Sequence, residues 1–222
     1  MKKLLMSWSG GKDSAMALAE LARSVGHEVI ALLTTLIEGP DERAQIQHVR
    51  GELIERQAAL LGLPLRRVSI PKGAANVVYE ARLLEALADF RGAGVEAVAF
   101  GDLFLADVRA YREGLLGRAG MTGLFPLWEQ DTTILLHDFV AGGSKAVVTS
   151  VSADVLGRSF AGREVDAEFI AALPAHVDPC GERGEFHTFV YGGPLLGGGE
   201  IRFRPGGMTE ADGHYFCDLL PA

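Results

Sequence analysis

The segment Ser9-Gly10-Gly11-Lys12-Asp13-Ser14 combines the residue types that bind phosphate groups. It follows an apolar run and opens a stretch with helical periodicity. A helix N-terminus exposes unpaired N–H groups and a partial positive charge, which together attract anions. The glycines allow a close backbone approach, the serines offer hydroxyl groups, and Lys12 supplies a mobile positive charge. The spacing differs from the Walker A and dinucleotide-binding motifs, so we predict a phosphate loop of another class.

A second group of reactive side chains lies near the end of the chain. Glu182 and Glu185 are three residues apart in a glycine-rich loop, and His187 follows them. Such a cluster is suited to orienting ammonia, to binding magnesium or to contacting a second substrate. The alternative is a solvated polar loop. Cys180 precedes the cluster, and we interpret it as a pocket residue and not a nucleophile, since an isolated buried cysteine usually packs as a small hydrophobe.

Asp13 and Asp102 each follow a predicted parallel strand, where open α/β sheets bind ligands. We expect Asp102, with Gly101 before it, to place a nucleotide or a magnesium ion, and a helix N-cap is the alternative. His48 precedes another helical segment. It either contacts phosphate or caps that helix.

Apolar patterns predict the elements that would position these residues. Buried strands are expected at 3–8, 28–36, 65–70 and 95–100, and helices at 14–25, where Val25 lies on the apolar face, at 48–61 and at 77–88. Strands that alternate with helices form βαβ units and a parallel sheet. Residues 120–128 are interpreted as a junction.

The second half is less regular. A helix is expected at 132–140, a strand at 145–151, a weak strand at 186–191, and short strands at 201–204 and 215–219. We therefore predict an α/β protein with a Rossmann-like parallel sheet in residues 1–125 and a smaller α+β domain in residues 126–222.

Composition excludes several classes of protein. The 222 residues have a net charge of -8, and residues 126–222 hold 14 acidic against 6 basic residues, which argues against stable nucleic-acid binding. No apolar run reaches the ~18 residues of a membrane span, and the N-terminal residues do not read as a signal peptide. Two cysteines make no disulfide framework, so a reduced, cytoplasmic protein is expected.

The 9–14 segment resembles the PP-loop of the ATP pyrophosphatase, or adenine-nucleotide α-hydrolase, superfamily. Members of this superfamily, which has the HUP-type Rossmann-like sheet, cleave ATP between its α and β phosphates. The resemblance implies that the six loop residues, together with His48, Gly101 and Asp102, bind ATP.

Other segments resemble the diphthine–ammonia ligase family, also described as the ATP-binding domain 4 family, over about residues 4–194. These segments lie at residues 48–64, 100–102, 111–113, 124–128, 156–166 and 177–191. The resemblance implies that Cys180, Gly181, Glu182, Glu185, His187, Tyr111 and Trp128 contact the substrate. For Trp128, a role in the core or at the domain junction is the alternative.

The family resemblance also implies a reaction. A carboxylate, that of diphthine on elongation factor 2, would be adenylated by ATP, and ammonia would then displace AMP. Lys12, Asp13, Glu182, Glu185 and His187 would be the catalytic residues. ATP and Mg²⁺ are the expected cofactors, Asp13 and Asp102 the expected metal ligands, and self-association into a homo-oligomer is compatible with the sequence.

Arg183 and His187 depart from the pattern of the ligases that act on elongation factor 2. The form found here resembles a bacterial-type branch of the family, which makes ATP binding a firmer inference than the acceptor. Two alternatives remain at this stage. One is a PP-loop enzyme acting on another carboxylate or on tRNA, and the other is a non-catalytic sensor of adenine nucleotides.

Overall fold

The strand–helix alternation of the first half folds into a parallel sheet, which we call sheet A. The computed structural model describes residues 1–44 and 47–222. The five parallel strands are β1 (Lys2–Ser7), β2 (His27–Ile37), β4 (Leu65–Ile70), β5 (Ala97–Ala99) and β6 (Thr122–Leu124). The short strand β3 (Arg43–Ala44) pairs antiparallel with the end of β2. The predicted Rossmann-like parallel sheet is confirmed.

The order of the strands creates a ligand-binding edge. β1 lies between β2 and β5, β4 lies beyond β2, and β6 lies beyond β5. The chain therefore adds β2 and β4 on one side of β1, and then crosses back to add β5 and β6 on the other side. A crevice opens at such a switch point, outside the carboxyl ends of the two central strands. The 9–14 loop follows β1 and Gly101 follows β5, so both lie at this point.

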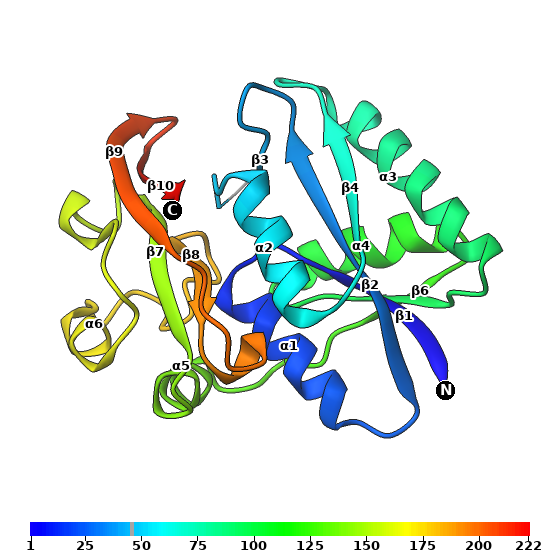
Figure 1. The fold of residues 1–222 in the computed structure, drawn as a ribbon, viewed down its shortest axis with the longest axis horizontal. Coiled ribbons are helices and arrows are strands. Elements are labelled where there is room, and N and C mark those ends of the chain that lie inside the picture. The colour runs from blue at the N-terminus through cyan, green and yellow to red at the C-terminus, as the bar shows by residue number, and fades with distance from the viewer. Residues whose placement is uncertain (45–46) are drawn as a thin grey trace.

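Helices cover both faces of sheet A (Figure 1). They are α1 (Lys12–Arg23), α2 (Gly51–Leu61), α3 (Asn76–Gly92) and α4 (Ala106–Arg118). Side chains alternate across a strand, so Leu4 and Met6 pack with α1 and α2, whereas Leu5 packs with α3 and α4. All three side chains are fully buried, as expected for a central parallel strand.

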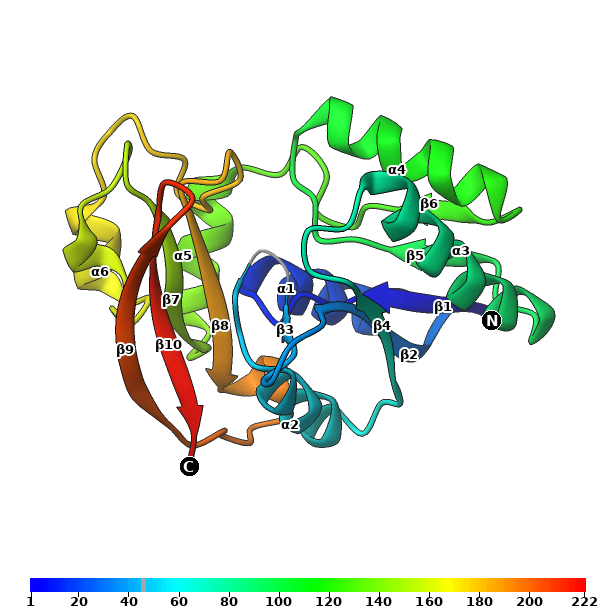
Figure 2. The same ribbon diagram turned by 90° about the horizontal axis from the view of Figure 1, so that it is seen from above.

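The second half forms an antiparallel sheet, sheet B, in the order β8-β7-β10-β9. Its strands are β7 (Lys145–Ser152), β8 (Phe186–Gly192), β9 (Phe203–Ala211) and β10 (His214–Pro221), and its helices are α5 (Thr132–Ala141) and α6 (Ala167–Ala172), with 3₁₀ turns at Arg158–Phe160 and Pro194–Leu196. Figure 2 shows sheet B standing beside sheet A, with β8 nearest to α1 and α2. The predicted smaller α+β unit is confirmed. The boundary between residues 125 and 126 stays a prediction.

Three element predictions need correction. The segment 120–128, interpreted as a junction, contains strand β6 of sheet A. Helix α1 ends at Arg23, and Val25 is fully exposed, because the chain turns at Gly26, whose φ of +103° leads directly into β2. The short strands expected at 201–204 and 215–219 are parts of a long hairpin. Its two-residue loop, Asp212-Gly213, has positive φ at both residues, which is the geometry that matches strand twist.

The two sheets are joined by a continuous core and by partly buried polar contacts. Asp218 on β10 accepts hydrogen bonds from Arg43 and Arg50 of the first unit, at 2.7 Å for Arg43 and at 2.7 and 3.1 Å for Arg50. Although burial works in the opposite direction, these two guanidinium groups hold the pKa of Asp218 well below its usual range. None of the helices in residues 1–44 and 47–222 is long and apolar enough to cross a bilayer.

Candidate functional site

A cavity of about 320 Å³ lies at the switch point of sheet A. Its wall comes from the ends of β1, β2 and β5, from α3 and α4, and from the loop before β8. That volume is at the lower end of the range for small-molecule sites. Eight residues predicted for the site line it: Ser9, Asp13, Ser14, Gly101, Asp102, Gly181, Glu182 and His187.

Gly10 packs closely against α2 and β8, and its contact with phosphate stays a prediction. Its φ is +80°, and an added Cβ would lie 2.5 Å from Ile54 Cδ1 and 2.8 Å from Gln57 Oε1. Its carbonyl oxygen accepts hydrogen bonds from the Val190 N–H at 2.9 Å and from Gln57 Nε2 at 2.9 Å. Gln57, which is fully buried, also accepts from Trp8 Nε1 at 2.8 Å and donates to the Val190 carbonyl at 2.6 Å. Sheet B and α2 thus fix the shape of the loop.

The expectation that Lys12 offers a mobile charge is wrong. Its side chain is 1% exposed, and Nζ donates to Asp13 Oδ2 at 3.0 Å and to the carbonyl oxygen of Cys180. Burial alone would lower the pKa of Lys12, but Asp13 beside it raises that pKa overall, so the ammonium stays charged. The Lys12 N–H donates to Thr188 Oγ1 at 3.1 Å. Lys12 therefore connects the phosphate loop to β8 and to the 178–187 loop that contains Cys180.

Asp13 has a carboxylate oxygen available to a ligand. Oδ2 is paired with Lys12, whereas Oδ1 is buried and has no hydrogen-bond partner among the described residues. Asp13 lines the cavity next to Ser9 and Ser14, whose hydroxyl oxygens are 3.1 Å apart. A buried, unpaired oxygen is costly unless a ligand satisfies it. This oxygen is therefore a candidate contact for a cation or a hydroxyl group.

Gly101 and Asp102 lie directly across from the phosphate loop. An added Cβ at Gly101 would be 2.6 to 2.8 Å from backbone atoms of Asp13 and Ser14, so only glycine fits. Arg112 holds the Asp102 carboxylate through two bonds, Nε to Oδ2 at 2.5 Å and Nη2 to Oδ1 at 3.0 Å. Because α4 begins with Leu105 as its N-cap, the capping alternative for Asp102 is wrong.

Glu182 and Glu185 lie in different surroundings. Glu182 lines the cavity and accepts one hydrogen bond, from the Leu103 N–H at 2.8 Å. Burial raises the pKa of Glu182 to about 7. Glu185 is buried within its own loop, where its two oxygens accept the N–H groups of Asp178 and Arg183 at 3.0 and 2.9 Å. Glu185 does not line the cavity.

His187 lies on β8 at the inner wall of the cavity. Burial lowers the pKa of His187 to about 4, and the nearby charge of Lys12 acts in the same direction. The imidazole is therefore neutral near pH 7, with one N–H donor and one acceptor nitrogen. It can hydrogen-bond a ligand but carries no charge for it.

Four other predicted residues lie outside this cavity. Cys180 is buried, burial raises the pKa of its thiol, and the thiol faces the carbonyl of Thr132. Tyr111 is exposed on α4 and contacts Glu80. Trp128 packs on Phe125 under Arg109. His48 lines a second cavity, where the centroid of its ring is 4.5 Å from that of Phe216. The capping alternative for His48 is wrong, because the N-cap of α2 is Arg50.

Several residues that position the site were missed. Gln57, Thr188 and Arg112 fall inside the resembling segments, but their contacts depend on the folded chain. The same holds for Asp178, which accepts the N–H groups of Cys180 and Glu182, both at 3.0 Å, and the Thr132 hydroxyl at 2.8 Å. A polar residue inside an apolar helical face, as at Gln57, is the signal that points to such a role.

Comparison with known proteins identifies the family of this chain. Residues 1–122 match the family model of the diphthamide synthase N-terminal domain, and residues 131–201 match that of the C-terminal domain. The diphthine–ammonia ligase of Schizosaccharomyces pombe is 31% identical over 212 residues, which are 87% of this chain and 35% of the relative. The diphthine–ammonia ligases of Danio rerio and Mus musculus are each 27% identical to this chain over 214 residues, which are 85% of this chain. The matched region makes up 81% of the Danio rerio protein and 78% of the Mus musculus protein. The chain thus spans about a third of the yeast relative's length.

Proposed function

This chain belongs to the diphthamide synthase family, and from that premise we propose that it is an ATP-dependent ligase that joins ammonia to a carboxylate. The family resemblance read from the sequence is confirmed. The observation that carries the proposal is the position of the PP-loop at the switch point of sheet A. There, Asp13 of the loop lines the same cavity as Asp102 and Glu182.

The reaction has two steps. In the first, an oxygen of the acceptor carboxylate attacks the α-phosphorus of ATP, and pyrophosphate leaves. In the second, the nitrogen of ammonia attacks the acyl carbon, AMP leaves with the bonding electrons, and a proton is released. A carboxylate needs this activation because its own oxygen is a poor leaving group. The phosphate loop favours the first step if its helix N-terminus stabilises the departing pyrophosphate.

Glu182 is suited to take up the proton that the second step releases. Its carboxylate lines the cavity, and a pKa of about 7 is close to the ideal for a general base near neutral pH. Lys12 and Glu185 act differently in this proposal. Lys12 holds the 178–187 loop against the phosphate loop, and Glu185 holds the backbone of the 178–187 loop itself, so both position the site and do not touch the reacting atoms.

The chemistry of the cavity fits a magnesium ion. The described residues contain no group of three His, Cys, Asp or Glu side chains arranged around a metal. Magnesium bound with a nucleotide needs only one or two carboxylates, because phosphates and waters supply the other ligands. Asp13, through its unpaired Oδ1, and Asp102 would hold the ion, which would neutralise phosphate charge.

We propose diphthine on elongation factor 2 as the acceptor, because the relatives are named diphthine–ammonia ligase. A cytoplasmic location follows from that acceptor. The alternatives are another carboxylate and a non-catalytic nucleotide sensor.

The test is incubation with α-labelled ATP and magnesium, with and without ammonium and diphthine-bearing elongation factor 2. AMP that requires both the factor and ammonium is the expected result. AMP that forms without the factor would redirect the search to another carboxylate. ATP binding with no AMP in any mixture would favour the sensor, and ADP as sole product would refute the mechanism.

A further inference from the structure

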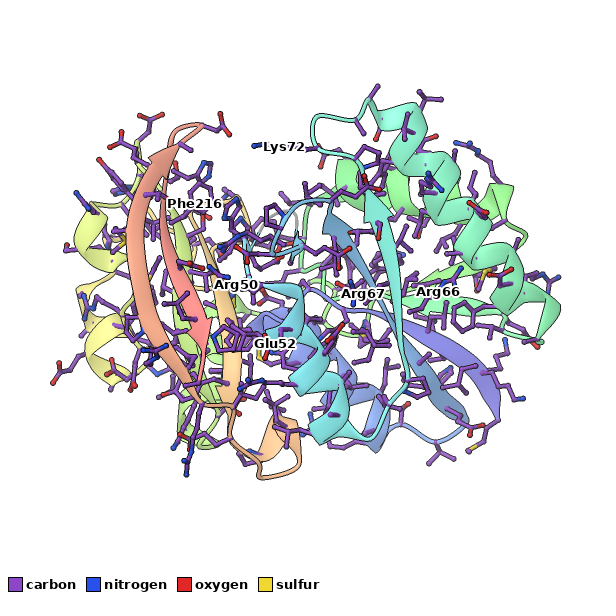
Figure 3. All side chains as sticks on the ribbon, turned by 45° about the horizontal axis from the view of Figure 1, so that its top comes forward. Arg50, Glu52, Arg66, Arg67, Lys72 and Phe216 are labelled. Atoms are coloured by element: carbon purple, nitrogen blue, oxygen red, sulfur yellow. The ribbon has the colours of Figure 1, made fainter. Side chains whose placement is uncertain are left out.

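A second cavity, of about 710 Å³, lies between sheets A and B. Its wall includes the chain after β2, the turn after β4 with Lys72, and residues of β7 and β10, among them Ser150 and Phe216. Figure 3 shows Lys72 extending from the end of β4 toward the strand that bears Phe216. The mechanism proposed above assigns no role to this space.

The second cavity adjoins the nucleotide cavity. Ala44 and His187 line both of them. A group held at the inner end of the second cavity is therefore next to the site proposed for ATP.

Ser150 marks the inner end of this cavity. It is 1% exposed, and its Oγ has no hydrogen-bond partner among the described residues. On β7 it pairs in register with His187 of β8, so the two residues are cross-strand neighbours. A buried hydroxyl without a partner needs an explanation, and a ligand oxygen supplies one. The hydroxyl can donate to a carboxylate, as can a neutral imidazole.

The charges at the mouth are compatible with an anionic ligand. Two acids there are already paired: Asp41 with Arg43 and Arg50, and Glu42 with Arg67. Lys72 is exposed and forms no ion pair within residues 1–44 and 47–222. Glu38 and Asp212 are also exposed, and solvent screens their charges as it does that of Lys72. The positive charge of Lys72 is therefore free to attract a carboxylate.

We propose that the second cavity receives the carboxylate-bearing acceptor, with its carboxylate directed to Ser150 and His187 and its approach favoured by Lys72. This inference rests on the ligase function proposed above and adds a site for the second substrate. The carboxylate then enters through the second cavity and meets the α-phosphate where the two cavities adjoin. ATP binding does not depend on Ser150 or Lys72.

The test compares Ser150→Ala with the wild type, with diphthine-bearing elongation factor 2, ammonium and ATP as substrates. We expect the KM for the factor to rise about tenfold, the effect of losing a hydrogen bond to a charged group. The affinity for a non-hydrolysable ATP analogue stays unchanged. Folding is also expected to survive, because the substitution removes an unsatisfied buried group. Ser152→Ala, on the same strand but outside both cavities, is the matched control.

Lys72→Glu is the second variant, and its exposed position makes misfolding a minor concern. We expect a higher KM for the factor, with an effect that shrinks as salt concentration increases. The control is Lys3→Glu. Lys3 is also exposed, and it lies at the amino-terminal end of β1, away from the cavities at the carboxyl ends of the strands.

The outcomes separate the two proposals. A raised KM in Ser150→Ala and Lys72→Glu, but not in the controls, supports the acceptor site. Unchanged KM values with an active wild type overturn the acceptor site and leave the ligase standing. A wild type that forms no AMP in any mixture overturns the ligase function and this inference with it.

Discussion

Substituting Gly101 by alanine tests whether close packing of two loops sets the geometry of the nucleotide site. A Cβ at this position would lie 2.6 Å from the carbonyl carbon of Asp13, 2.7 Å from the Ser14 nitrogen and 2.8 Å from the Asp13 oxygen. All three are backbone atoms, so no side-chain rotation can relieve the contact. Ordinary contact begins at 3.4 Å. The loop after β5 must therefore move away from the start of α1 by ~0.8 Å, a shift inferred from packing distances.

The free-energy cost of this shift can be taken from measured effects of overpacking, in which a larger side chain replaces a smaller one in a packed site. Extra methyl groups in tight sites cost about 1–3 kcal/mol. At about 2 kcal/mol, the unfolding midpoint would fall by roughly 4–8 °C for a chain of this size. If instead the PP-loop moves while the fold holds, the same energy would weaken ATP binding by roughly 30-fold. Thermal unfolding and calorimetric titration with a non-hydrolysable ATP analogue measure the two effects separately.

Gly114→Ala is the matched control for this experiment. Gly114 lies within α4, and no described atom comes within 4 Å of its added Cβ. Alanine in a helix interior is favoured over glycine by about 1 kcal/mol, so this variant should be as stable as the wild type or more so. A Gly101→Ala variant that matches the wild type in both stability and nucleotide affinity would refute the packing argument.

Three further predictions follow from the same contacts. At a constant concentration of unprotonated ammonia, the rate of AMP formation by the wild type should rise through about pH 7 as Glu182 loses its proton. In Glu182→Gln this rise should disappear. A rise that persists in the variant would assign the general base to another residue. Lys12→Met leaves the Asp13 carboxylate without its partner, so denaturant unfolding should show a loss of about 3–5 kcal/mol, against nearly none for the exposed Lys2→Met. Iodoacetamide should label Cys180 only in denaturing urea, because burial raises the pKa of its thiol and blocks access; rapid labelling of the folded protein would contradict this.

Much of the fold could be predicted because its signals are local. The buried strand that contains Leu4, Leu5 and Met6 and the helix after the phosphate loop are visible in the sequence, and their alternation determines a parallel sheet. The long β9–β10 hairpin was underestimated. Its Asp212-Gly213 loop is a strong hairpin signal, but the solvent-exposed, glycine-containing β9 lacks the apolar alternation that marks a strand.

The arrangement of the PP-loop was less accessible, because it depends on contacts distant in the sequence. The loop glycines Gly10 and Gly11 are expected to let the backbone approach phosphate closely. In the structure, Gly10 makes room for Gln57, and Gly101 makes room for the loop backbone. Lys12 was expected in solvent, yet it crosses to a carbonyl group 168 residues away. Residue type predicts what a side chain can bind, but only the fold decides whether protein or ligand occupies that place.

Glu182 and Glu185 show why pattern alone could not divide the roles within a cluster. The two residues have the same chemistry and lie three positions apart in a loop. Glu185 is buried and receives two backbone N–H groups, whereas Glu182 is half-buried, receives one and borders the cavity. Burial raises the pKa of Glu182 to about 7, because burial disfavours the charged carboxylate and one hydrogen bond compensates for little of that cost. The residue with weaker support from the protein is therefore the one equipped to exchange a proton near neutral pH, and the better-bonded residue keeps the loop in place for it.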